Sequence, residues 1–371
     1  RYAVPIGASA GALGEIGVGL WLPSAAAAQL SVQSEAEEFS RFLRQRRLHA
    51  YTVNGFPFDN FHQPVVKRKV YLPTWWQPQR LHYTQQLADI LAVLLPESEP
   101  VGSISTLPIG WPSELSDPSQ LLQAGQNLRE LADHLRSIES RTGKRIVVAI
   151  EPEPGCILDT TDDVIRWFEE HLPEPHHRTY LAVCHDICHS AVMMESQSDV
   201  LSRLAAAGVA IGKVQVSSAI VADWTSMTTD VKHQAMQQLG EFAEDRYLHQ
   251  TGRKTAAGEF QLAEDLPQLV RGGGGGRCDL HEDQRWVVHF HVPIFLKKFG
   301  HLKTSQEDVI AALRTLSSGA GSPGSPLEFT GHLEIETYAW TVLPEAMRGR
   351  GLVEDVAMEF EWLGRVIADI G

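Results

Sequence analysis

The alternation of short apolar, β-branched runs with longer segments of helical periodicity is the strongest constraint in this sequence. Eight runs have the length and composition of strands, namely 17–22, 49–58, 101–109, 145–150, 180–183, 209–216, 286–295 and 332–337. Strands that alternate with helices form parallel sheets. Eight such units predict a closed (β/α)8 TIM barrel of the α/β class. A Rossmann sheet is disfavoured because no G-x-G-x-x-G fingerprint follows the early strands.

Local signals at the starts of the intervening segments support helices. These signals are polar N-caps or first-turn prolines, namely Ser34 with Glu37, Pro78, Asp117 with Pro118, Thr161 and Thr304. Apolar residues at helical spacing predict a final helix over 353–367.

The length of 371 residues and an apolar content of 43% fit a globular protein with a sizeable core. We expect one TIM-barrel domain over 1–371 with surface loop insertions. The longest insertion, about 219–285, should hold a helix and loop structure, such as a lid, and it contains a glycine-rich loop at 272–276. The chain opens at Arg1 rather than Met, so we expect it to begin within a longer reading frame.

Charge and cysteine content narrow the expected partners and location. The net charge of −14 argues against nucleic acid, whose binding depends on phosphate electrostatics. No apolar run approaches the length of about 20 residues that a membrane helix needs. Four cysteines are too few for a disulfide framework and favour a reducing compartment, so we expect a cytoplasmic protein. The sequence leaves homo-oligomerisation open.

Polar side chains collect where the expected strands end. They are Glu151, Glu153, Asp186, His189, Gln215, His289, His291, Glu334 and Glu336. In a parallel barrel these ends converge on one mouth. A lone glutamate there pairs more often with Lys or Arg, and a lone histidine is more often a core residue. Buried carboxylates in this number need partners, however, and Lys213 is the one basic residue at these ends. A divalent cation is therefore predicted.

This pattern resembles the xylose isomerase-like barrels, which include ketose epimerases, sugar-phosphate isomerases and metal-dependent apurinic endonucleases. The shared features are a Glu at one strand end, Asp-x-x-His at the next, and a Glu after the last strand. The resemblance implies one divalent ion (Mn, Mg, Co, Zn or Fe) held by Glu151, Asp186, Gln215 and Glu336. Gln215 stands where the family has His, and His291 could substitute for it.

The resemblance also implies roles in catalysis. Glu151 and Glu336 would act as acid and base, and His189 would position a substrate hydroxyl. Other residues predicted to contact the substrate are Asn54, His62, Glu153, Lys213, His249, His289 and Glu334. Two of them have structural alternatives: Lys213 could pair with Glu151 or Asp186, and His249 could be structural. Within the pairs Glu151/Glu153 and Glu334/Glu336, Glu153 and Glu334 are the alternative metal ligands.

A closer resemblance covers most of the chain, from about Asn54 to Pro344. The strings TVNGFPFDNFH, EPEPGCILDTTDD, VCHDICHSAV, VHFHVPIF and LEIETYAWTVLP are similar to the xylose isomerase-like metabolite traffic proteins of the bacterial ebo gene cluster. The resemblance implies processing or traffic of a small polar metabolite (a sugar, cyclitol or phosphate ester), with other proteins of the cluster as partners. It also implies a further strand-like segment upstream.

Two other functions remain open at this point. The barrel could bind and hand on a metabolite without catalysis, with Gln215 marking the loss of a tight metal site. It could also be a metal-dependent phosphodiesterase of the endonuclease type, using His189, His289 and His291, although the net charge speaks against DNA. A serine hydrolase is disfavoured because no G-x-S-x-G elbow is present, whereas Cys184 or Cys188 could be nucleophiles.

Overall fold

The structure of the protein is a computed structural model that describes residues 2–11, 14–61, 63–271, 283–319, 327–336 and 338–371. The chain divides into two compact units, which are described separately. The first unit contains 1–185, 202–214 and 319–334, and the second contains 186–201, 215–318 and 335–371. His62, the glycine-rich loop at 272–276 and most of the linker at 319–326 lie outside the described residues. The prediction of a single domain stays a prediction.

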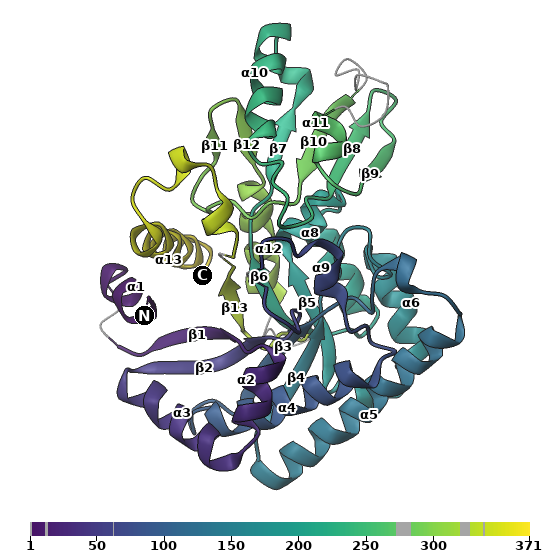
Figure 1. The fold of residues 1–371 in the computed structure, drawn as a ribbon, viewed down its shortest axis with the longest axis vertical. Helices are drawn as coiled ribbons and strands as arrows, with labels where there is room; N and C mark the ends of the chain where they lie inside the picture. The colour runs from purple at the N-terminus through teal and green to yellow at the C-terminus, as the bar shows by residue number, and fades with distance from the viewer. Residues whose placement is uncertain (1, 12–13, 62, 272–282, 320–326, 337) are drawn as a thin grey trace. The chain divides into compact units, whose positions relative to one another are not determined.

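The first unit is built on a seven-stranded parallel sheet (Figure 1). Its strands follow the chain order: β1 (Ile16–Trp21), β2 (Leu48–Asn54), β3 (Val101–Thr106), β4 (Arg145–Ile150), β5 (Leu181–Asp186), β6 (Ile211–Val216) and β13 (Leu333–Ile335). Ile104 of β3 pairs with Val148 of β4, and Ile150 of β4 pairs with Val183 of β5. The last residues of β5, β6 and β13 belong to the second unit.

The two edge strands of this sheet approach each other. A Cβ atom on Gly19 of β1 would meet the Glu334 carboxylate of β13, so these two strands approach each other closely at this point. His332, next to β13, contacts residues of two other strands: its Nδ1 is 2.8 Å from Ser103 Oγ, and its ring centroid is 5.0 Å from that of Tyr51. The sheet is therefore curled into a nearly closed barrel, which confirms the predicted fold class.

Helices connect these strands. They are α1 (Ala3–Ser9), α2 (Ser24–Leu30), α3 (Gln33–Gln45), α4 (Pro78–Leu94), α5 (Ser119–Thr142), α6 (Thr161–His171) and α7 (Pro175–Arg178), and α9 (Gln197–Ala206) spans both units. α4 packs on β2, β3 and β4 and against α3 and α5. Its side chains Leu87, Ile90 and Leu91 are at most 1% exposed, as expected for a helix covered on several faces.

Most of the predicted helix starts are close to the observed ones. Pro78 is the first residue of α4, and Asp117 Oδ1 accepts the Ser119 N–H at the start of α5. The N-cap of α6 is Thr160, one residue before the predicted Thr161. The capping box at Ser34 is wrong, because α3 begins at Gln33 without a side-chain cap.

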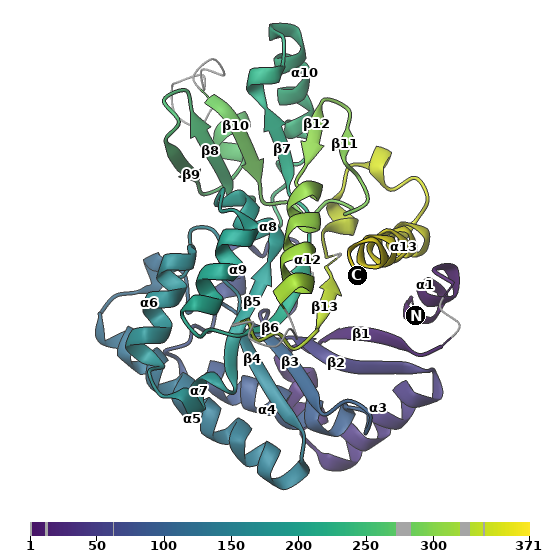
Figure 2. The ribbon, with the colours of Figure 1, turned by 180° about the vertical axis from the view of Figure 1, so that it is seen from behind.

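The second unit contains a six-stranded sheet in the order β11-β12-β7-β10-β8-β9 (Figure 2). The strands are β7 (Ile220–Asp223), β8 (Thr251–Thr255), β9 (Phe260–Ala263), β10 (Asp283–Val288), β11 (Lys298–Phe299) and β12 (Leu302–Thr304). The helices are α8 (Ile187–Val192), α10 (Thr229–Gly240), α11 (Pro267–Val270), α12 (Gln306–Gly319) and α13 (Leu352–Ile370). The predicted Thr304 cap and C-terminal helix correspond to α12 and α13.

One expected barrel strand belongs to this second sheet. The run 286–295 contributes to β10, whose Val287 pairs antiparallel with Val221 of β7 and with Gly252 of β8. The expectation of an eighth parallel strand there is wrong, because an apolar run predicts a strand but not its partner. The segment 219–285 holds the expected helix α10 and also strands β7, β8 and β9, which the sequence did not reveal.

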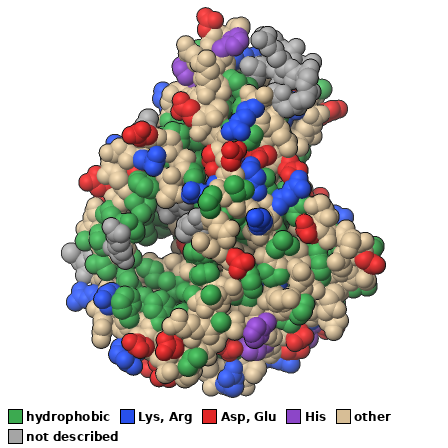
Figure 3. Space-filling model, in the orientation of Figure 1, with side chains coloured by type: hydrophobic (Ala, Val, Ile, Leu, Met, Phe, Trp, Pro, Cys, Tyr) green, Lys and Arg blue, Asp and Glu red, His purple; other side chains and the backbone are tan. Residues whose placement is uncertain are grey.

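The surface of the first unit is partly apolar. Hydrophobic side chains gather over β1 and α1 on the face drawn in Figure 3. Tyr2, Val4, Val32 and Phe42 are each at least 44% exposed, and every residue of β1 is at least partly exposed. Among the described residues, no helix is both long and apolar enough to cross a bilayer.

Candidate metal centre

Asp186 ends β5 and caps helix α8, and it is the anchor of a polar cluster in the second unit. Its Oδ1 accepts hydrogen bonds from Ser217 Oγ at 2.7 Å and from the His189 N–H at 3.0 Å. Its Oδ2 is buried and makes no hydrogen bond. The nearest cationic groups are imidazoles: Nε2 of His291 at 3.7 Å and Nε2 of His189 at 3.9 Å. Within the described ranges, no Lys or Arg pairs with Asp186.

The cluster holds Asp186 ionised despite its burial. Burial raises the pKa of Asp186, but the charges of His189 and His291 and the hydrogen bond from Ser217 outweigh it and lower the pKa. Burial lowers the pKa of His291, and the neighbouring Asp186, Cys188 and Glu336 reverse that effect and raise it well above its ordinary value. A buried carboxylate and a buried imidazole thus stabilise each other's charged forms.

Two imidazoles of the cluster lie close to a further polar group. His291 Nδ1 lies 3.2 Å from Glu336 Oε2, and His289 Nδ1 lies 2.7 Å from Gln250 Oε1. Metal-bound histidines usually donate their distal N–H to such a carboxylate or carbonyl oxygen, which fixes the tautomer that offers Nε2 to the metal. His289 Nε2 faces His189 Nε2 at 3.2 Å.

The donor atoms of Asp186, His189 and His291 fit a divalent ion. They lie within 4.8 Å of one another. Ligand atoms bound at about 2.0–2.1 Å in a tetrahedron are about 3.3 Å apart, so the observed 3.7 and 3.9 Å need an inward movement of a few tenths of an ångström. Two nitrogens and one carboxylate suit Zn, Fe, Co or Mn better than Mg. We call these three residues the aspartate site.

Gln215 is the predicted ligand that departs from the family pattern. Its side chain is fully buried, and neither its Oε1 nor its Nε2 has a hydrogen-bond partner. A buried amide without partners costs about 1–3 kcal/mol. A ligand for its carbonyl oxygen would remove part of that cost, and the role of Gln215 as a metal ligand stays a prediction.

In the first unit, Lys213 forms an ion pair with Glu334, with Nζ 2.5 Å from Oε2. The ion-pair partner is therefore Glu334 rather than the predicted Glu151 or Asp186, although the Glu151 charge also acts on Lys213. Burial lowers the pKa of Lys213, but Glu334, Cys184 and Glu151 outweigh it and raise the pKa. The ammonium group stays protonated, so it is unsuited to a Schiff base.

Two other predicted residues of the first unit have structural contacts. Glu153 Oε1 accepts a hydrogen bond from Tyr71 Oη at 2.7 Å. Asn54 Oδ1 accepts from the Phe56 N–H at 3.2 Å and from Ser105 Oγ at 3.3 Å, which fixes the turn after β2. Glu151, directly after β4, is buried.

His249 lies behind the imidazole cluster of the second unit. Its Nδ1 is 2.9 Å from the His289 carbonyl oxygen, and its Nε2 is 3.0 Å from Glu244 Oε1. Its ring stacks on Phe290 with centroids 4.8 Å apart. His249 thus positions the backbone of His289.

Sequence reasoning missed three residues that shape this cluster: Ser217, Gln250 and Glu359. Burial raises the pKa of Glu359 to about 8, and its Oε1 accepts the Ile294 N–H. Cys188 is also buried, which raises the pKa of its thiol to about 11 and makes it a poor nucleophile. Of the three residues that were missed, Ser217 could have been proposed from the sequence as part of the cluster, because it follows Gln215 by two residues.

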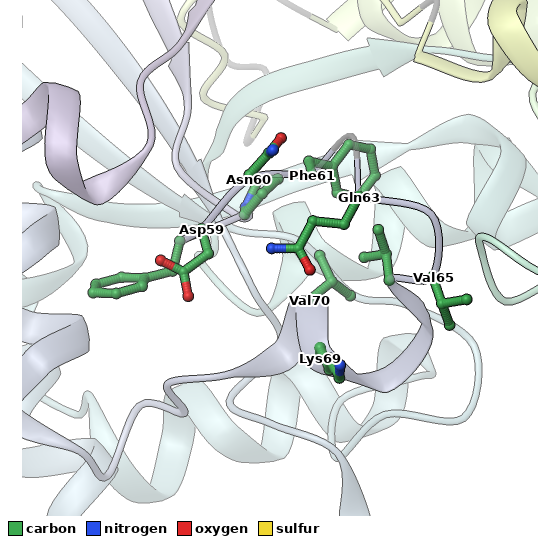
Figure 4. A pocket seen from close by; sticks show the side chains of 10 residues that line it. Asp59, Asn60, Phe61, Gln63, Val65, Lys69 and Val70 are labelled. Carbon is green, nitrogen blue, oxygen red and sulfur yellow. The ribbon is translucent and has the colours of Figure 1, made fainter.

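Two pockets lie apart from these residues. In the first unit, a pocket of about 70 Å³ follows β2 and is lined by Asp59, Asn60, Gln63 and Lys69, among others (Figure 4). It is smaller than the 300–1,000 Å³ typical of ligand sites. In the second unit, the lining of a pocket of about 700 Å³ includes the ion pairs of Lys303 with Asp223 and of Lys297 with Glu307.

Comparisons with known proteins return similar folds at low sequence identity. No family model and no curated protein matches the chain. Similar solved structures are a xylose isomerase-like TIM barrel protein from Mycobacterium smegmatis in complex with magnesium (12% identity, TM-score 0.49, 99% of this chain and 88% of that one) and a D-tagatose 3-epimerase-like protein (11%, 0.48, 95% and 89%). A xylose isomerase domain protein from Planctomyces limnophilus is a third (12%, 0.47, 99% and 92%).

Proposed function

We propose that this protein is a metal-dependent isomerase or epimerase acting on a small polyhydroxylated carbonyl compound, such as a sugar, a cyclitol or one of their phosphate esters. One observation carries the proposal. The buried Asp186 Oδ2 makes no hydrogen bond and lies 3.7 and 3.9 Å from two imidazole nitrogens. A buried carboxylate needs a cationic partner, and a divalent ion ligated by the two imidazoles in their neutral form would supply that charge in place of their protons.

The residues of the second unit have distinct roles in this proposal. Asp186, His189 and His291 would hold the ion, and the Gln215 amide oxygen is a further ligand. A bound divalent ion would polarise a substrate carbonyl and its neighbouring hydroxyl. Ser217 and Glu336 hold Asp186 and His291 in place.

Glu336 is the proposed acid–base group of the second unit. Its side chain is 14% exposed, whereas that of Asp186 is fully buried, so Glu336 is the more accessible carboxylate of the two. It would take a proton from the carbon next to the carbonyl and return it. Glu151, in the first unit, is the second carboxylate that the sequence predicts for this chemistry.

The finer assignment follows from the resemblance to the ebo-cluster proteins. We infer that the reaction belongs to the processing or traffic of a secondary-metabolite precursor, with other proteins of the cluster as partners. A phosphodiester substrate is the second candidate, because His189, His289 and His291 gather in one cluster.

Elemental mass spectrometry of the purified protein and of two variants tests the proposal. We expect about one transition-metal ion per chain in the wild type and a large loss in Asp186→Ala, with a smaller loss in Glu336→Ala. Asp245→Ala, at an exposed residue paired with Arg271, is the matched control and should keep the ion. A panel of ketoses, cyclitols and their phosphates would then identify the substrate.

The contradicting result is equally clear. Wild-type protein that stays metal-free after incubation with Mn²⁺, Zn²⁺ or Fe²⁺ overturns the metal-dependent reaction and leaves a metabolite carrier. Metal-loaded protein that cleaves phosphodiesters but converts no member of the panel selects the second candidate.

A further inference from the structure

A second set of donor atoms lies beside the aspartate site in the second unit. The thiol of Cys188 and the rings of His289 and His291 each offer one ligand atom, and the three atoms lie within 4.8 Å of one another. Their residues are 0%, 5% and 4% exposed. We propose that these residues form a softer metal site, called here the thiolate site, which takes Zn²⁺ and competes with the aspartate site for His291.

The surrounding contacts favour coordination by these residues. Gln250 Oε1 accepts from His289 Nδ1, which leaves Nε2 of that ring as the lone-pair nitrogen. The Cys188 N–H donates to Ser217 Oγ at 2.9 Å, and the same hydroxyl donates to Asp186 Oδ1. One serine therefore positions a residue of each site.

The two sites differ in the hardness of their donors. The aspartate site offers one carboxylate oxygen and two nitrogens, and the thiolate site offers one sulfur and two nitrogens. Carboxylate suits Mn²⁺ and Mg²⁺, whereas thiolate selects Zn²⁺ and other soft ions. On binding, the Cys188 thiol and the protonated His291 ring each lose one proton to solvent, because the thiolate and the neutral imidazole are the forms that ligate.

Sharing of His291 makes the two sites exclusive. A neutral imidazole offers one lone pair, so a single His291 nitrogen serves one ion at a time. The chain would therefore hold one ion, and the metal that is present decides which site is filled. Zn²⁺ in the thiolate site would displace Mn²⁺ and inhibit the proposed reaction; this consequence rests on the proposed function, whereas the site itself does not.

Cobalt and manganese binding to the metal-free full chain distinguish the sites. Co²⁺ should produce a thiolate-to-cobalt charge-transfer band in the wild type and in Asp186→Asn, but not in Cys188→Ser. Cys156→Ser, which removes another buried free thiol in the first unit, is the matched control and should keep the band. Zn²⁺ affinity should fall in Cys188→Ser by more than the 10- to 100-fold that loss of an outer-shell partner costs. Mn²⁺ affinity should fall by less than this 10- to 100-fold range in the same variant and by more than it in Asp186→Asn.

X-ray absorption of the zinc-loaded wild type needs no variant and should show one sulfur among the nearest neighbours. A zinc shell of oxygen and nitrogen alone, or a cobalt complex without the charge-transfer band, overturns the thiolate site. Loss of Mn²⁺ binding in Asp186→Asn would still support the aspartate site. Unchanged Mn²⁺ binding in that variant, together with a sulfur neighbour of zinc in the wild type, would contradict the aspartate site and leave the thiolate site standing.

Discussion

Each of the two units contains a carboxylate with a buried oxygen atom, and the two have different kinds of partner. In the first unit Glu334 pairs with Lys213, whose raised pKa keeps its ammonium group charged. In the second unit Asp186 faces His189 and His291. A lysine ammonium has no lone pair to give, whereas an imidazole can lose its proton and ligate a metal. The first arrangement can only stabilise the barrel, and the second can also bind an ion.

The largest expected effect is in the first unit. Lys213→Met leaves the Glu334 carboxylate buried without its partner, and breaking a buried pair this way costs about 3–5 kcal/mol. The double variant Lys213→Met with Glu334→Leu should recover much of that loss. Urea unfolding of the wild type, the single variant and the double variant measures the free energy of unfolding of each. Equal stability of the single variant and the wild type would contradict the role of the pair.

In the second unit, Asp186→Asn should act mainly on metal binding. We expect Mn²⁺ to raise the melting temperature of the wild type, because a ligand that binds only the folded state stabilises it. The variant should lose this shift. Differential scanning calorimetry with and without Mn²⁺ provides the measurement, and Asp245→Ala should behave like the wild type. A full shift in Asp186→Asn would exclude this carboxylate as a ligand.

Stability should depend on pH in opposite directions in the two units. Burial raises the pKa of Glu359 from 4.5 to about 8, so the folded chain keeps a proton on Glu359 that the unfolded chain releases. The stability that this proton contributes is lost as pH rises from 4.5 to 8. Burial and the Lys213 charge lower the pKa of His332 from 6.5 to about 4. The stability that the neutral His332 ring contributes is therefore lost as pH falls from 6.5 toward 4.

Urea unfolding across pH 4–9 separates these two groups. Glu359→Gln should abolish the loss of stability that runs from pH 4.5 to 8, and the effect is seen without overlap from His332 above pH 6.5. His332→Gln should flatten the acidic side alone. An alkaline side that is identical in Glu359→Gln and in the wild type would show that Glu359 does not change its protonation on folding.

A smaller effect is expected where the barrel edges meet. Gly19→Ala places a Cβ against the Glu334 carboxylate, which its ion pair with Lys213 holds in place. Overpacking of this kind costs about 1–3 kcal/mol. Gly240→Ala is a helical control with open space around the added Cβ and should not destabilise the chain. Equal effects at both glycines would contradict the contact between β1 and β13.

The sequence predicted the strands better than their partners. Apolar, β-branched runs are local signals, so the seven barrel strands were located, whereas the run at 286–295 was placed in the wrong sheet. Its antiparallel partner β8 lies in the insertion that was expected to hold a helix and loops. Asp186 and His189 were named from the sequence because they follow one strand, and their role as metal ligands stays a prediction.

The contacts around those residues could not be foreseen. Ser217 reaches Asp186 across 31 positions, and Gln250 reaches His289 across 39. Lys213 pairs with Glu334, 121 positions away in the chain, rather than with the nearer Glu151 or Asp186. Such contacts depend on how the chain folds back on itself, which residue spacing does not encode.

A crystal structure of the full chain grown with Mn²⁺, with anomalous data, tests the central claim most directly. We predict one anomalous peak at about 2.0–2.3 Å from Asp186 Oδ2 and from an imidazole nitrogen of His189 and of His291. A Mn²⁺-loaded crystal without a peak at Asp186, or with its peak bound by other residues, would contradict the assignment of the metal centre.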